Sequence, residues 1–160
     1  MNWNEKIDRI KKLYSHDKFS VPHINRKDIL TQIETKFIKR SKNYYELNTY
    51  TGPFINWWTN INSSFNLTTT RSYESMITKL VRNDKNYWVA CEGNNLILIY
   101  KANLEALIDL CSIGQTYTKT YHIIDMKYNF MISFKIIKQN EVEFKFCGEN
   151  KAFKNIKDIN

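Results

Sequence analysis

Three polar residues of this chain have the chemistry that acid–base catalysis needs. Glu92 directly precedes Gly93, and His122 and Asp125 lie three positions apart in the stretch YHIID. A histidine and a carboxylate act as a pair only within hydrogen-bond reach of each other. Residues three apart in a strand point to opposite faces, so we expect no working pair unless the segment bulges. For Glu92 and Asp125, turn chemistry and ligand binding at a sheet end are equally good explanations.

The other residue types that carry chemistry are sparse. The three histidines have no partner at the three- or four-residue spacing of a helical metal site, and there is no G-x-S-x-G serine motif. Cys91, Cys111 and Cys147 lie far apart without a CxxC pair, which predicts buried thiols instead of a disulfide or a zinc site. The four glycines are never clustered, which excludes P-loop and Rossmann enzymes. We therefore predict no catalytic residue, no metal and no cofactor.

Composition predicts a folded cytoplasmic protein. The 160 residues are 42% hydrophobic and 14% aromatic, which is typical of a chain that buries a core, and the length fits one domain over residues 1–160. Charges recur every few residues in MNWNEKIDRIKKLY, where a secretory signal would need an apolar run. No window approaches the roughly 18 apolar residues of a membrane span, so we expect no membrane partner.

Positive charge is concentrated in the N-terminal third. The formal charge is +8, and residues 1–50 hold 11 of the 24 basic residues but only 6 of the 16 acidic ones. A nucleic-acid partner would explain this excess, and so would the lysine-rich bias of an AT-rich genome. The stretch KFIKRSKNYY (36–45) interleaves cations with rings, as single-strand binders do, although a helix end in water accounts for the same residues. Its residues of interest are Lys39, Arg40, Lys42, Tyr44 and Tyr45.

Five segments have apolar residues at helical spacing. Asn2 and Glu5 form a capping pair for the first, Asn25 and Ser72 are caps for the second and fourth, and Gly114 stops the fifth. The five apolar faces run from Trp3 to Tyr14, Ile29 to Phe37, Phe54 to Ile61, Tyr73 to Leu80 and Leu104 to Cys111.

The adjacent tryptophans in TGPFINWWTNI belong to the third of these segments. Gly52-Pro53 is typical of a helix start. At about 100° per residue, Trp57 and Trp58 lie about 100° apart and share one broad face with Phe54. We favour burial of both rings against the core, with a solvent-facing binding site as the alternative. Our candidate partner-binding residues are therefore Lys39, Arg40, Lys42, Tyr44, Tyr45, Trp57 and Trp58.

Five apolar or alternating runs predict strands. YWVAC (87–91) and LILIY (96–100) flank the turn EGNN, and VEFKF (142–146) alternates as a strand with one wet face does. YHIID (121–125) and FMISFKI (130–136) complete the set. The predicted fold class is α+β: N-terminal helices packed on a mainly antiparallel five-stranded sheet, with one inserted helix (104–111) that crosses the sheet.

The segment TYHIIDMKYNFMISF (120–134) resembles a family of small bacterial proteins of unknown function. The similarity extends back through NYWVA, YESMITKLV and FINWW, over about residues 54–134, with the same order of elements. In that family the second hairpin strand carries a tryptophan followed by histidines, whereas this chain has Phe130 and later Lys135 to Lys138. A site built on those histidines would be missing here.

The family is similar in size and architecture to immunity proteins that neutralise a toxin by blocking its active site. The resemblance therefore implies a protein partner, and tyrosines are favoured in such interfaces. A charge of +8 has the wrong sign for a nucleic-acid mimic, so a toxin with an acidic surface fits better. We predict a non-enzymatic protein-binding module of immunity or inhibitor type. The alternative is a nucleic-acid-binding protein that uses the basic N-terminal third, and a small-molecule or enzymatic role ranks third.

Overall fold

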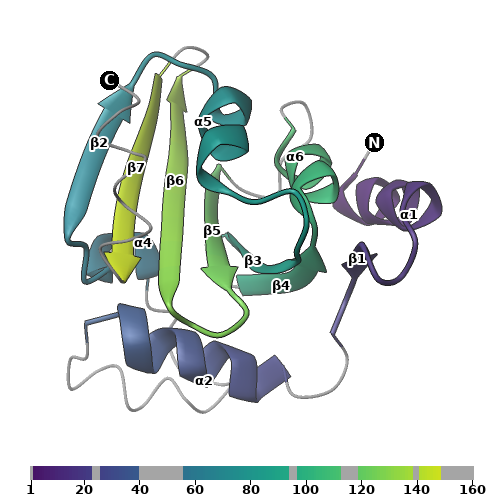
Figure 1. Cartoon of the computed structure of the whole chain (residues 1–160), viewed down its shortest axis with the longest axis horizontal. Coiled ribbons are helices and arrows are strands. Elements are labelled where there is room, and N and C mark those ends of the chain that lie inside the picture. The colour runs from purple at the N-terminus through teal and green to yellow at the C-terminus, as the bar shows by residue number, and fades with distance from the viewer. Residues whose placement is uncertain are drawn as a thin grey trace.

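A seven-stranded antiparallel sheet with helices on both faces forms the body of the protein (Figure 1). The computed structural model describes residues 2–22, 26–39, 56–93, 97–112, 119–138 and 141–148. The strand order is β1-β4-β3-β5-β6-β7-β2. Helices α1, α5 and α6 contribute to the core on one face, and α2 and α4 to the core on the other.

The helices have the following bounds: α1 Trp3–Leu13, α2 Arg26–Phe37, α4 Trp57–Asn60, α5 Tyr73–Leu80 and α6 Leu104–Cys111. The strands are β1 Phe19–Ser20, β2 Phe65–Thr69, β3 Tyr87–Glu92, β4 Ile97–Ala102, β5 Thr120–Asp125, β6 Phe130–Lys138 and β7 Glu141–Gly148.

Local capping explains where the helices start. Asn2 and Glu5 form the expected reciprocal capping box at α1, with distances of 2.8 and 2.9 Å. The Ser72 hydroxyl accepts from the Ser75 amide at α5, as predicted. The predicted cap at Asn25 and stop at Gly114 lie outside the described residues. Helix α4 begins at Trp57, after an Asn56 cap, and the predicted helix start at Gly52-Pro53 lies outside the described residues.

The α+β class is confirmed, but the prediction of five strands is wrong. The five predicted strands correspond to β3 to β7, and two edge strands, β1 and β2, add to them. Strand β1 has only two residues, too few for a periodicity to be visible. Strand β2 alternates half-buried Phe65, Leu67 and Thr69 with exposed Asn66 and Thr68. Because it is short and mostly polar, its sequence does not show the apolar pattern that predicts a strand.

The inserted helix crosses the sheet as predicted. Strands β4 and β5 both pair antiparallel with β3, one on each side, so they run parallel to each other. Parallel strands need a crossover connection, and α6 provides it over β3. Between β5 and β6 the connection is a tight turn in which the Tyr128 amide donates to the Asp125 carbonyl at 2.8 Å.

Aromatic stacking dominates the core on the α5 side of the sheet. The Phe134 ring is fully buried, and its centroid lies 5.2 to 5.8 Å from the rings of Tyr121, Phe144 and Tyr73. Such ring pairs stabilise a protein beyond the area that they bury. Because Tyr73 belongs to α5, these contacts also fix that helix on the sheet.

Replacing Phe134 with alanine should lower the free energy of unfolding by about 3–5 kcal/mol, because it empties a fully buried ring site. Urea titration followed by circular dichroism measures the loss. Ile137→Ala is the control, since Ile137 lies on the same strand with 36% of its surface exposed, and should cost about 1 kcal/mol or less. Equal losses for the two variants would contradict this account of the core.

Candidate functional site

The seven candidate partner-binding residues all belong to the segment 39–60. Lys39 is exposed directly after α2, and Arg40, Lys42, Tyr44 and Tyr45 lie outside the described residues. Trp57 and Trp58 are only 1% and 7% exposed and form part of the core beneath α2 and α4. The structure therefore shows the favoured burial of both tryptophans.

The two ends of this segment are joined side by side. Ile38 and Ile61 form an isolated antiparallel bridge. The Lys39 amide donates to the Asn60 carbonyl at 2.7 Å, and the Asn62 amide donates to the Phe37 carbonyl at 2.8 Å. We call this three-part contact the loop base. Ile38 and Ile61, which flank the segment 39–60, are thus held next to each other.

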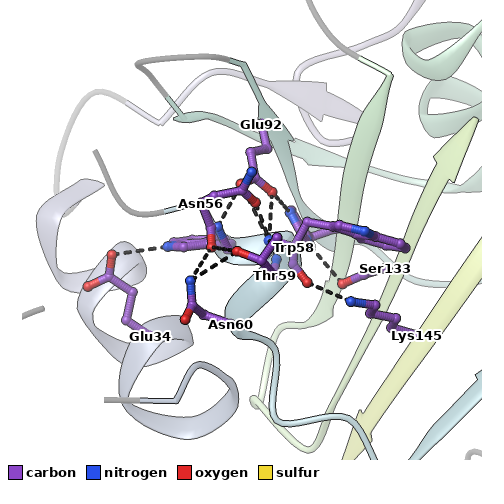
Figure 2. Close-up of polar contacts among 10 residues, drawn as sticks. Glu34, Asn56, Trp58, Thr59, Asn60, Glu92, Ser133 and Lys145 are labelled. Atoms are coloured by element: carbon purple, nitrogen blue, oxygen red, sulfur yellow. Dashed lines mark hydrogen bonds and ion pairs between the residues drawn. The ribbon is translucent and has the colours of Figure 1, made fainter. Parts of the chain in front are cut away.

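A carboxylate from the sheet holds the start of α4. One oxygen of Glu92, Oε1, accepts from the Trp57 amide at 2.6 Å, and Oε2 accepts from the Trp58 amide at 3.2 Å. The first amides of a helix have no partner within it and favour a negative charge. Figure 2 shows Glu92 reaching from the sheet to this end of α4, where Asn56 also caps the Thr59 amide. Glu92 is thus an acceptor for the helix from a distant part of the chain.

Glu92 also belongs to a buried polar cluster with His122 and Ser133. Imidazole Nε2 lies 2.6 Å from Glu92 Oε2, and Nδ1 lies 2.6 Å from the Ser133 hydroxyl oxygen. Glu92 is 6% exposed, and the other two residues are fully buried. In the tautomer with the proton on Nε2, Nε2–H donates to Glu92, and Nδ1 accepts from the Ser133 hydroxyl. In this arrangement every polar atom of the cluster has a partner, as burial requires.

Sheet register explains why these three residues meet. His122 is directly opposite Ser133 on β6 and opposite Ala90 on β3. Glu92 is two residues beyond Ala90, so it faces the same side of the sheet as His122, at the diagonal position. The cluster is therefore built across three neighbouring strands.

The order of hydroxyl, imidazole and carboxylate is also that of a hydrolase triad. Here, however, the serine and histidine are fully buried, and the carboxylate is engaged by the α4 amides. Asp125 takes no part in the cluster; it accepts from Lys85 Nζ at 3.1 Å and from the Asn129 amide. These contacts give the cluster a structural role, which is to fix α4 on the sheet.

Further contacts fix the two tryptophans of α4. Trp57 Nε1 donates to Glu34 Oε1 of α2 at 3.2 Å, and the Trp57 ring meets the His122 ring edge to face at 5.5 Å. On the other side, Lys145 of β7 donates to the Trp58 carbonyl at 2.8 Å, and its Nζ lies 4.4 Å from the Trp58 ring centroid (Figure 2). Burial of Lys145 lowers the pKa of its ammonium group. Cation–π attraction to the ring favours the charged form.

Sequence reasoning considered Glu92 and His122 separately and did not identify Ser133. One signal was present: Ser133 and His122 are polar residues inside otherwise apolar strands, FMISFKI and YHIID. A polar side chain at a buried position must find a partner, so the two residues predict each other once the strands are paired. The sequence did not show the register of β5 with β6, which places His122 opposite Ser133.

Comparison of the chain with protein-family models, with curated proteins and with solved structures gives no match. Within the described ranges, no helix combines the length and the apolar character needed to cross a membrane. In the same ranges, no group of three or more His, Cys, Asp or Glu side chains is arranged to hold a metal ion.

Glu92→Gln should lower the free energy of unfolding by about 1.5–3 kcal/mol, because it removes the buried charge that accepts from two amides and from His122. Hydrogen exchange at the Trp57 and Trp58 amides should accelerate as α4 loosens. The control is Glu143→Gln on β7, a half-buried glutamate outside the cluster, where about 0.5 kcal/mol or less is expected. Unchanged exchange at both amides in Glu92→Gln would contradict the anchoring role.

Proposed function

We propose that this chain is a non-enzymatic protein-binding module of bacterial immunity or inhibitor type, which contacts its partner through the segment 39–60. One observation carries the proposal. The segment that holds all seven candidate residues has its two ends joined at the loop base. The helix at its C-terminal end, α4, is anchored by the buried Glu92 carboxylate.

Such anchoring is what a binding segment needs. Ordering a segment on association costs free energy, and fixing its ends beforehand reduces that cost. Trp57 and Trp58 are buried and anchor the segment, so the remaining candidates for recognition are Lys39, Arg40, Lys42, Tyr44 and Tyr45. Arginine and tyrosine are enriched among the residues that dominate binding energy.

Charge favours an acidic partner. The chain carries +8, and Lys39, Arg40 and Lys42 lie within four consecutive positions of the proposed binding segment. Complementary charge accelerates association and rejects partners of like sign. Together with the resemblance to a family similar to immunity proteins, this supports a toxin with an acidic surface as the partner.

Tyr44→Ala with Tyr45→Ala should weaken binding of the partner at least about tenfold, because truncating two interface rings removes buried area. The tagged full-length chain would be purified from its native host, the stoichiometric partner identified by mass spectrometry, and its Kd measured for each variant. Recovery of no stoichiometric protein, or an unchanged Kd in the double variant, would count against the proposal.

Two charge-matched variants distinguish protein binding from the alternative function, nucleic-acid binding. Alanine at Lys39, Arg40 and Lys42 removes three cations from the segment, and alanine at Lys11, Lys12 and Lys18 removes three exposed cations elsewhere. Each set would be tested against the protein partner and against labelled oligonucleotides at several salt concentrations. We expect only the first set to weaken protein binding. Oligonucleotide affinity that falls steeply with salt, and is weakened by both sets because both lie in the basic N-terminal third, would favour the alternative.

A further inference from the structure

Strand β2 ends the sheet without the features that usually protect an edge. In the described part of the chain it pairs only with β7. Natural edge strands discourage pairing with other chains by lysine, proline or bulges. The segment from Asn62 to Thr70 contains no charged residue and no proline, although the chain carries 40 charged side chains, 24 basic and 16 acidic. The edge strand and its flanks therefore carry neither lysine nor proline as protection.

We propose that two copies of this chain associate edge to edge through β2, antiparallel, with the two-fold axis at Leu67. This register brings Leu67 next to its own equivalent, Phe65 opposite Thr69 of the second copy, and Asn66 opposite Thr68 of the second copy. All five residues of β2 are paired, and the two seven-stranded sheets become continuous.

The apolar pattern of β2 restricts the register. Phe65 and Leu67 are only half-buried and pack against the aromatic core on the α5 face, whereas Asn66 and Thr68 are exposed on the other face. Residues directly opposite each other in an antiparallel pair share a face, so a one-residue slip would place apolar side chains beside polar ones. Only registers centred on a residue, such as Asn66, Leu67 or Thr68, keep the apolar side chains together.

The charges on the neighbouring strand line up differently in these three registers. On β7, Lys145 lies opposite Asn66, and Glu143 lies opposite Thr68. With the axis at Leu67, each row across the dimer joins Lys145 of one copy to Glu143 of the other. An axis at Asn66 would align the two Lys145 residues, and an axis at Thr68 would align the two Glu143 residues. Only the Leu67 axis aligns opposite charges.

The charge effect is weak at physiological salt. The aligned charges are separated by three strand spacings, or about 14 Å, which exceeds the screening length of about 8 Å at physiological salt. Affinity must therefore come from the new backbone hydrogen bonds and from the burial of Leu67 and Phe65. The self-pairing edge is on a different part of the chain from the segment 39–60, so this inference does not depend on the proposed function.

Sedimentation velocity of the full-length chain from 1 to 500 µM, on the order of the range that separates weak from tight dimers, tests the pairing. The wild type should show a monomer–dimer equilibrium. Lysine at both Asn66 and Thr68 places like charges opposite each other twice and should weaken the dimer at least about tenfold. The matched control has Asn66→Asp with Thr68→Lys, which pairs opposite charges in the proposed register and should keep the dimer.

Each outcome decides the question. A wild type that stays monomeric throughout overturns the proposal, and so does a dimer that the double-lysine variant leaves intact. Loss of the dimer in the Asp/Lys control as well contradicts the Leu67 axis. Circular dichroism and urea midpoints establish that the variants fold, and Asn66→Asp with Thr68→Asp is a second like-charge variant if the double-lysine protein does not.

Discussion

The carboxylate of Glu92 connects parts of the chain that are distant in sequence. It accepts from the amides that start α4 and from His122 of β5, which in turn contacts Ser133 of β6. A buried charge is tolerated only when hydrogen bonds replace its hydration. Here two amides and His122 contact the carboxylate, and Ser133 contacts the other nitrogen of His122. The position of α4, which forms the end of the segment 39–60, depends on these hydrogen bonds.

The two faces of the sheet are packed by different means. On the α5 side, stacked rings around Phe134 provide a large and mainly apolar core. On the α4 side, the apolar contacts of Trp57 and Trp58 surround a polar cluster, and Lys145 covers the outer tryptophan. Apolar packing tolerates many arrangements, whereas a hydrogen-bonded cluster requires one. The second face therefore suits the task of holding one short helix in one place.

Sequence reasoning predicted what depends on local pattern. The capping box at Asn2 and Glu5, the cap at Ser72, five of the strands and the crossover helix all follow from residues close together in the chain. It did not predict what depends on pairing. The edge strands β1 and β2 are too short or too polar to show a pattern, and the cluster of Glu92, His122 and Ser133 exists only once β3, β5 and β6 are in register. The residues proposed for recognition stay a prediction, since most of them lie outside the described ranges.

The loop base has an evolutionary consequence. Because Ile38 and Ile61 lie side by side, the entropic cost of closing the intervening chain grows only slowly with its length. Doubling the number of residues between them would add only about 0.6 kcal/mol to that cost. Closure entropy therefore places little constraint on the length of this part of the chain during evolution.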